Sequence, residues 1–316
     1  MNLFILFLSL QLACNSSQPG CTDPLAVNFD SSATEEDHSC FYDTVFINPL
    51  WSVELSEQIN ETSGLILWNE VLLTMNDNSD TRLYALDKVS GEIVGDYLIP
   101  GVVNRDWEEL DQDEEFIYVG DIGNNRGSRK DLHILRIDKL SLSSGDPAID
   151  TIWFSFSDQQ NYITEGQQET EFDCEAFVVT ADSIYLFTKQ WLSGHTTQYA
   201  MPKLPGTYIA QKRSTFDTRG QVTGAVLIES SGILILSGYS GLIQPFLFLF
   251  SDYQGLDFFS GVSQRVNLPL PFHQLEAVTS DDGIRCYISN ESSAYGQAIK
   301  IPQKLHLVDL SELLGK

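Results

Sequence analysis

The sequence predicts an all-β fold, a five-bladed β-propeller closed by an N-terminal strand, with a six-bladed propeller as the alternative. Five stretches share one pattern: a small or acidic residue, an apolar strand, a turn, a second strand and a polar loop. Repeats of roughly 40–50 residues built in this way are typical of propeller blades. From Thr44 onward, turn residues recur about every eight to twelve residues and no helical stretch is expected, which favours β-structure throughout.

The clearest copy of the pattern begins with Asp-Trp-Glu-Glu-Leu at residues 106–110. It continues through an apolar strand at residues 116–120 into a polar loop at residues 121–126. Four weaker copies lie elsewhere in the chain. At the equivalent position of each copy stands one residue with a side-chain oxygen: Ser63, Glu108, Glu175, Thr223 and Glu276.

The spacing of these positions favours five blades over six. Between Glu108 and Glu175 the gap is 67 residues, whereas the other gaps are 45 to 53 residues. The surplus of about 20 residues is too short for four more strands of about five or six residues each. We therefore expect a polar insertion at residues 158–172.

The two ends of the repeat region predict how the ring closes. Residues 44–55 form one spare strand before the first repeat, and the last repeat ends one strand short. A propeller that completes its last blade with its first strand removes two unpaired sheet edges. We expect residues 45–55 to pair with a strand near residues 305–310, and residues 44–316 to form the propeller.

The N-terminus has the features of an export signal. Residues 1–13 form an apolar run too short to span a bilayer as a helix, although it lacks the usual basic start. Leu12, Ala13 and Cys14 resemble a bacterial lipobox, which would make Cys14 the lipidated first residue of the mature protein. Otherwise Cys14 is an ordinary residue of a signal cleaved by another peptidase. The sequence thus predicts an exported protein, anchored by lipid to the cell surface or outer membrane, or periplasmic.

The next segment resembles a short cysteine module of exported proteins from Bacteroidetes-type bacteria. The resemblance covers residues 20–42 and includes Cys21 and Cys40. A disulfide between them fits an oxidising exterior, and closing a loop of that size contributes roughly 3 kcal/mol. The acidic residues of this module either hold a cation or only solvate a tether at residues 14–43. Cys174 and Cys286 are expected to be free and buried.

The charge of the chain argues against nucleic acid as a partner. The sequence has 18 basic and 44 acidic residues, which gives a formal net charge of −26. Such a surface repels nucleic acid and anionic membranes, and it suits calcium or a saline exterior. The alternative is that the acidic residues only keep the protein soluble.

The five equivalent positions predict a ring at the mouth of the central channel. Three carboxylates that converge on one axis repel each other unless a cation lies among them or their pKa values rise. Ca²⁺ takes six to eight oxygen ligands and tolerates irregular geometry, whereas zinc prefers His and Cys, which the ring lacks. The sequence therefore predicts Ca²⁺ held by Ser63, Glu108, Glu175, Thr223 and Glu276. The alternative is that water or backbone amides satisfy these residues in ordinary turns.

A ring of Ser, Glu, Glu, Thr and Glu, one residue per blade, resembles the calcium-activated nucleotidase (apyrase) family. That resemblance implies a five-bladed propeller with Ca²⁺ in its channel, and Thr223 departs from the serine expected there. Residues 106–110 and 120–126 also resemble exported bacterial propellers described as phytase- or esterase-like. The likeness covers the chain from about residue 44 to its end, and a shared fold does not by itself imply a shared activity.

Polar residues of the second loops are expected on the same face. Arginine binds phosphate oxygens with two parallel hydrogen bonds, and an aspartate can orient an attacking water. The expected catalytic residues are Asp77, Asp121 and Arg126. The expected ligand-binding residues are Arg105, Arg129, Lys189, Tyr239 and Glu291. Alternatively, Arg126 and Arg129 pair with the surrounding acidic residues, and residues 121–125 form an Asx-rich turn.

Three classes of function remain open from the sequence: the two that follow, and an assembly or scaffold lipoprotein that binds no ligand. The first is a calcium-dependent phosphohydrolase that acts on a small phosphorylated molecule. The second is a surface binding module for a glycan, peptide or protein, with structural calcium. The chain has no Gly-x-Ser-x-Gly elbow, Walker loop or His-Glu-x-x-His motif, so no common catalytic signature decides between them.

Overall fold

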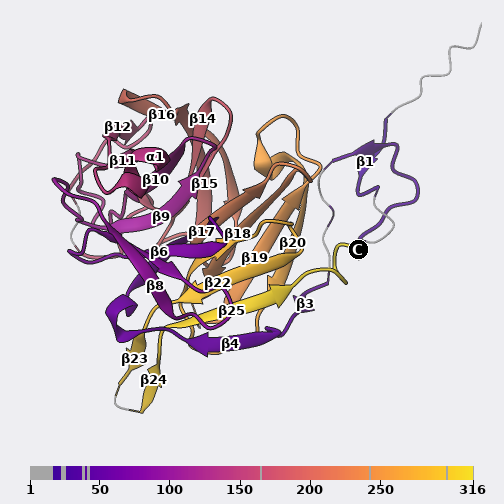
Figure 1. Cartoon of the computed structure of the whole chain (residues 1–316). Coiled ribbons are helices and arrows are strands. Elements are labelled where there is room, and N and C mark those ends of the chain that lie inside the picture. The colour runs from indigo at the N-terminus through magenta and orange to yellow at the C-terminus, as the bar shows by residue number, and fades with distance from the viewer. Residues whose placement is uncertain are drawn as a thin grey trace, which may run out of the picture. The chain divides into compact units, whose positions relative to one another are not determined.

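The alternation of apolar strands and polar turns produces an almost entirely β-structured unit, Thr44–Lys316 (Figure 1). The computed structural model describes residues 17–22, 26–37, 40, 43–163, 166–241, 243–296 and 298–315. The chain divides into two units, Met1–Asp43 and Thr44–Lys316. In the described segments, no helix is long and apolar enough to span a bilayer.

The larger unit consists of groups of four hydrogen-bonded strands. The first group is β5 (Thr62–Trp68), β6 (Val71–Asn76), β7 (Arg82–Leu86) and β8 (Ile93–Leu98). The second is β9 (Trp107–Gln112), β10 (Phe116–Asp121), β11 (His133–Asp138) and β12 (Ile149–Phe156). The third is β13 (Asp173–Val179), β14 (Ser183–Lys189), β15 (His195–Pro202) and β16 (Gly206–Asp217).

Two further groups complete the unit. The fourth is β17 (Gln221–Ile228), β18 (Ile233–Tyr239), β19 (Pro245–Ser251) and β20 (Val262–Asn267). The fifth is β21 (Leu275–Thr279), β22 (Arg285–Asn290), β25 (Lys304–Asp309) and β4 (Trp51–Glu54). A hairpin of β23 (Ser293–Tyr295) and β24 (Ile299–Ile301) is inserted between β22 and β25.

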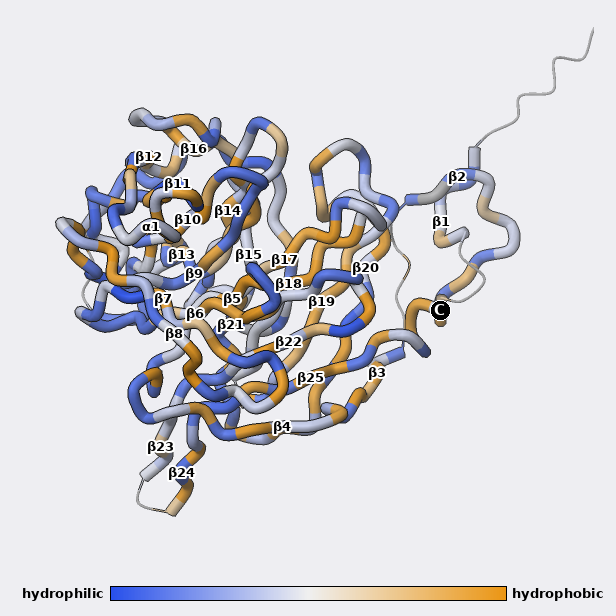
Figure 2. The backbone as a smooth tube through the Cα atoms, in the orientation of Figure 1, coloured by the Kyte–Doolittle hydropathy of each residue, from blue (hydrophilic) through white to orange (hydrophobic). Residues whose placement is uncertain are grey.

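The first strands of the groups form a closed ring. β5 contacts β9, β9 contacts β13, β13 contacts β17, β17 contacts β21, and β21 returns to β5. Each pair of neighbouring groups encloses one apolar cluster, and the strands that supply these clusters show orange residues interspersed with white and blue ones in Figure 2. Phe177 and Phe187 are completely buried there, and burial of such a side chain stabilises the fold by about 1.5–3 kcal/mol. The predicted all-β fold is confirmed, and its arrangement is propeller-like.

The chain closes the fifth group with a strand from its beginning, as predicted. β4 pairs antiparallel with β25, with Val53 opposite Leu305. The expected single strand at residues 45–55 is nevertheless wrong, because β3 (Val45–Phe46) pairs in parallel with β20 of the fourth group. Pro49 separates the two short strands. Proline has no amide hydrogen and restricts the residue before it, so the segment bends between the two groups.

A buried hydrogen-bond chain reinforces this closure. Asn290 fixes its amide by donating to the carbonyls of Glu291 and Pro302, so its Oδ1 accepts from Nε2 of His306 at 2.9 Å. Nδ1 of the same ring then accepts from the Ser52 hydroxyl at 2.7 Å. Burial lowers the pKa of His306 to about 3, so the imidazole is neutral. With one ring nitrogen donating and the other accepting, it links Asn290 of β22 to Ser52 of β4.

Two features of the second and third groups differ from expectation. A helix, α1 (Lys139–Ser144), follows β11; Asp138 caps its first turn by accepting from the Ser141 amide, and Gly145 ends it with a positive φ of 83°. In addition, β12 and β16 pair in parallel and join both groups into one eight-stranded sheet. In the described part of residues 157–172 there is no strand, which agrees with the predicted insertion.

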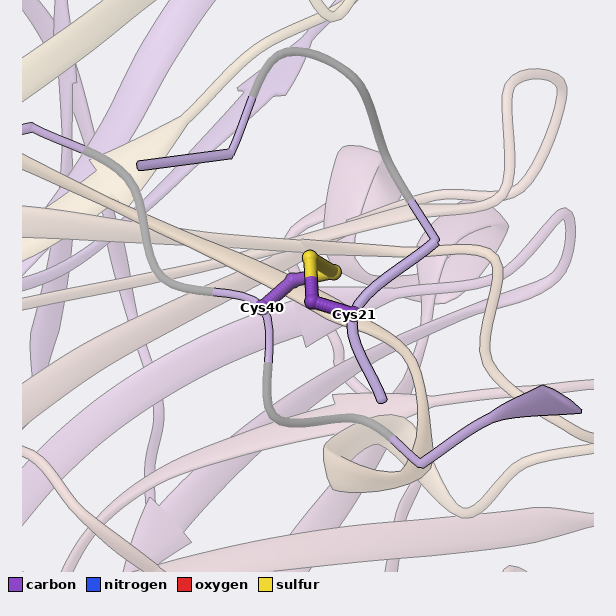
Figure 3. Close-up of a disulfide and its surroundings, with 2 residues drawn as sticks. All are labelled: Cys21 and Cys40. Carbon is purple, nitrogen blue, oxygen red and sulfur yellow. A yellow bond between two sulfur atoms is a disulfide. The ribbon is translucent and has the colours of Figure 1, made fainter. Parts of the chain in front are cut away.

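The smaller unit contains the cysteine module. Cys21 and Cys40 form a disulfide (Figure 3). Nearby, β1 (Pro19–Gly20) pairs in parallel with β2 (Glu35–Glu36). Cys14, the predicted lipidation site, lies outside the described residues. Cys174 and Cys286 in the larger unit are free and buried, as expected.

Candidate ligand-binding cavity at the channel mouth

Every first strand of the ring carries an irregularity near its start. The strand register skips one residue in each group, which is the sign of a β-bulge, and a bulge redirects the side chain that it contains. The skipped residues are Gly64, Glu108, Glu175, Thr223 and Glu276. Four of these are predicted ring positions, whereas Ser63 of the first group lies directly before its bulge.

These strand ends surround a cavity of about 340 Å³. It is lined by eight of the residues predicted from sequence: Ser63, Asp77, Glu108, Glu175, Lys189, Tyr239, Glu276 and Glu291. The lining also includes residues outside that predicted set, among them Glu61, Trp191 and Gln274. Side chains distant in sequence therefore meet here; of the five predicted ring positions, Ser63, Glu108, Glu175 and Glu276 are among them and Thr223 is not.

Among the residues that the structure describes, the only basic side chain that lines this cavity is that of Lys189, at the end of β14. Its Nζ lies 3.1 Å from Oε2 of Glu175, 4.6 Å from the centre of the Trp191 ring and 5.5 Å from the centre of the Tyr239 ring. Burial acts to lower the lysine pKa, but the charge of Glu175 and its neighbours raises it well above its usual value. The ammonium group is therefore a protonated counter-ion built into the acidic ring.

The other carboxyl groups have no such partner. Glu108 and Glu276 are 5 % and 8 % exposed, and no described residue forms a hydrogen bond with either carboxyl group. Burial, followed by neighbouring carboxylates, raises the pKa of Glu108 well above its usual value, and burial does the same for Glu276. Burial and the charges of Glu291 and Glu61 raise the pKa of Asp77 to about 8. Binding of a cation or of protons among these carboxyl oxygens would therefore be favourable.

A glycine permits two of these acids to approach each other. A Cβ atom on Gly123 would overlap both Oδ2 of Asp106 and Oε1 of Glu108. Burial and the charge of Asp173 raise the pKa of Asp106 to about 6. Gly123, in the loop after β10, thus leaves room for both carboxyl groups, and Asp106 itself lines a neighbouring recess rather than the cavity.

Some predicted residues have other partners. Asp121 is completely buried; its Oδ1 lies 2.6 Å from Nη2 of Arg129, and its Oδ2 accepts from the Arg105 amide. Both Arg129 and Arg105 also pair with Asp131, each at 3.2 Å. Asp121 and the two arginines are not among the residues that line the cavity. They form a structural ion-pair network, which was the alternative considered for Arg129.

Arg126 and Thr223 also lie outside the lining of the cavity. Arg126 is exposed and lines a neighbouring recess of about 280 Å³, and Asn125 contributes to both hollows. The Thr223 hydroxyl donates to the Leu275 carbonyl at 2.6 Å, and the Ser63 hydroxyl donates to the Glu108 carbonyl at 2.5 Å. Both hydroxyls therefore tie one first strand to the next.

Inside the ring, Glu109 spans the channel. Its Oε2 accepts from the Ala225 amide of β17 at 2.7 Å, and its Oε1 accepts from the Leu110 amide. Complete burial raises the pKa of Glu109 well above its usual value. No role was expected for Glu109 from the sequence, although the doubled glutamate of residues 108 and 109 distinguishes this repeat from the other four.

In the described part of the chain, no group of three or more His, Cys, Asp or Glu residues is placed so that it could hold a metal ion. The carboxyl groups are instead distributed around the cavity wall. A Ca²⁺ ion shared by the five ring residues therefore stays a prediction.

Comparisons with known proteins give no family. No family model and no curated protein matches the sequence. Among solved structures, a glutaminyl cyclase from Myxococcus xanthus is similar to this chain, with 10 % identity and a TM-score of 0.49. The match covers 84 % of this chain and 99 % of the cyclase. Hydrazine synthase from Kuenenia stuttgartiensis matches 78 % of this chain over 59 % of its own, with 9 % identity and a TM-score of 0.39. The computationally designed protein Ika8 matches 75 % of this chain over 58 % of its own, with 12 % identity and a TM-score of 0.32.

Proposed function

We propose that this protein is an exported, cation-dependent binding module built on a five-bladed propeller, each four-stranded group being one blade. The observation that carries the proposal is the composition of the cavity: six carboxyl groups and one ammonium group line about 340 Å³. Like charges gathered in a partly dry space repel each other until a cation or protons neutralise them. Binding of a cation at this site should therefore stabilise the folded protein.

Ca²⁺ is the first ion to test. It prefers oxygen ligands and accepts irregular arrangements. The carboxyl groups of Asp77, Glu108 and Glu276 line the cavity and form no ion pair with a described basic side chain. They are not grouped as a metal site among the described residues, so binding of Ca²⁺ would have to draw them together. Lys189 already neutralises Glu175. The chemistry that the ion would supply is positive charge at the channel mouth, which would fix the surrounding loops for a ligand.

The binding module is favoured over a phosphohydrolase. A phosphoester needs several cationic groups around its oxygens, as arginine clusters provide. Two of the three arginines expected to bind phosphate, Arg105 and Arg129, are engaged by Asp131 and Asp121. The aromatic rings of Trp191 and Tyr239 in the cavity wall are better suited to contact an organic ligand.

The proposed location follows from the other unit. The disulfide between Cys21 and Cys40 supports an oxidising compartment. We propose lipidation at Cys14, with residues 14–43 as a tether. Mass spectrometry of the mature protein tests this directly, and an unmodified Cys14 would reject it.

The cation proposal is tested by thermal unfolding in chelator and in increasing CaCl₂ at constant ionic strength. Linkage gives about 2.7 kcal/mol at a hundredfold excess of ion over Kd. Glu276→Gln should abolish most of this gain. The matched control is Glu229→Gln. Glu229 lines a different pocket, together with Asp111, so this variant should keep the stabilisation by Ca²⁺. A melting temperature that no cation changes in the wild type overturns the proposal, and turnover of a phosphoester panel would favour the hydrolase instead.

A further inference from the structure

We infer that the organic ligand of this cavity is a linear polyamine, a molecule with two or more protonated amines separated by short methylene chains. The inference rests on the proposed cation-binding function and names the class of cation. Three features of the site support it: an ammonium group already bound there, unpartnered carboxyl groups on the remaining walls, and the size of the cavity.

The Lys189 side chain shows how the cavity holds an ammonium group. The Nζ atom lies 3.1 Å from a Glu175 oxygen and near the faces of two aromatic rings, at 4.6 Å from Trp191 and 5.5 Å from Tyr239. Indole and phenol faces attract cations, and a carboxylate completes the neutralisation. Trp191 is held in place because its Nε1 donates to Asp173 at 2.7 Å. The same chemistry recognises amines of a ligand.

The remaining carboxyl groups lie on other blades. Glu108 belongs to the second blade and Glu276 to the fifth, and Asp77 follows β6 of the first. Glu108 and Glu276 are more than nine-tenths buried, line the cavity, and accept no hydrogen bond from any described residue. Lys189 reaches from the third blade and pairs with Glu175 of the same blade. A single small cation would neutralise only some of these carboxyl groups, whereas a chain of spaced amines could pair with several of them at once.

The size and layout favour an extended cation over a compact ion. The cavity of about 340 Å³ falls in the range of small-molecule pockets, roughly 300–1,000 Å³, and greatly exceeds the roughly 30 Å³ that one water occupies in the liquid. Among the described residues, no three acidic or His or Cys side chains are grouped as a metal cage. Carboxyl groups contributed by several strands around this cavity match a ligand whose charges are also dispersed.

The test is isothermal titration of the wild-type protein with spermidine, putrescine and butylamine at about 0.15 M salt, where surface charges further apart than roughly 8 Å are screened. We expect saturable binding of one spermidine, with putrescine weaker and butylamine at least tenfold weaker than spermidine. Spermidine should also compete with Ca²⁺. Glu276→Gln and Asp77→Asn should each weaken spermidine at least tenfold, while Glu229→Gln should not.

The outcomes separate this inference from the function on which it rests. If Ca²⁺ stabilises the protein but spermidine binds no better than butylamine, the polyamine inference is overturned and the cation site stands. If neither cation binds, both fail. Binding of many spermidine molecules with no loss in Glu276→Gln would show general attraction to an acidic surface and would also overturn the inference. The competition with Ca²⁺ uses only the wild type, so it remains decisive if a variant does not fold.

Discussion

Replacement of Lys189 by methionine tests the electrostatic reasoning most directly, because methionine keeps much of the side-chain volume and removes the charge. The Lys189 and Glu175 side chains are 7 % and 3 % exposed and lie 3.1 Å apart. Removal of one partner from such a buried pair costs about 3–5 kcal/mol, because the other charge is left unpaired. The two aromatic rings contribute roughly another 0.5–2 kcal/mol of cation–π attraction.

The expected result is a fall in melting temperature on the order of 10 °C in chelator, since about 1 kcal/mol shifts a domain of 150–250 residues by roughly 2–4 °C. Added Ca²⁺ or spermidine should restore part of the loss by supplying the missing charge, up to about 2.7 kcal/mol at a hundredfold excess over Kd. Differential scanning calorimetry with and without cation measures both effects.

The matched control is Lys203→Met. Lys203 pairs with Asp113 at 2.9 Å, but both side chains are partly exposed, at 18 % and 23 %. Such a pair contributes about 0–1 kcal/mol, and no cation should rescue its loss. If Lys189→Met is no less stable than Lys203→Met, the reasoning about a buried counter-ion is refuted.

Four further outcomes follow from the same geometry. Burial raises the pKa of Asp77 from 3.8 to about 8, so between these pH values the folded state holds a proton that the unfolded state has released. The free energy of unfolding in chelator should therefore fall as the pH rises from about 4 to 8. Calorimetry of Asp77→Asn should show a flatter pH profile. Gly123→Ala places a methyl group against Asp106 and Glu108, which should cost about 1–3 kcal/mol in denaturant unfolding and weaken cation binding; an unchanged midpoint would contradict the close approach. Thr223→Val removes a hydroxyl that donates to a carbonyl, so we expect a loss of about 1 kcal/mol with calcium affinity unchanged, whereas a lost calcium response would restore Thr223 as a ligand. Reduction of the Cys21–Cys40 disulfide should leave the melting of the larger unit unchanged, and a coupled transition would show otherwise.

The repeat pattern predicted the all-β class because each copy combines a strand-length apolar run with turn residues. In the structure these apolar runs form strands. The pattern also brought Glu108, Glu175 and Glu276 to one cavity. The β-bulges that turn these side chains inward were not predicted, because a skipped residue in the register depends on the neighbouring strand rather than on local propensity. The break at Pro49 was readable from sequence, and the proline rule should have divided the expected strand.

The role of Lys189 required the structure. A lysine at the end of a strand in an acidic chain is usually solvated. Nothing in the sequence states that Lys189, which stands opposite Asp173 in the strand register, reaches the carboxyl group of the bulged residue Glu175. In the same way, the pairing of Asp121 with Arg129 depends on the path of the loop between them. Side-chain partners across a turn or a ring are set by three-dimensional packing, so sequence can propose the membership of a site more readily than its charge pairing.

The closure of the fifth group has a consequence for the order of events during folding. Ser52 and His306 are 254 residues apart in the chain and hydrogen-bonded in the ring. The entropy of bringing such distant segments together rises only with the logarithm of their separation, about 0.6 kcal/mol per doubling, but the contact cannot begin before the distant segment has emerged. Until β25 is available, β4 has no partner in its sheet and β22 presents a bare edge, which is the state most exposed to wrong pairing with other chains. The pairing of β25 with β4 therefore completes the fifth group, and the ring should close only after the chain through β25 has been released.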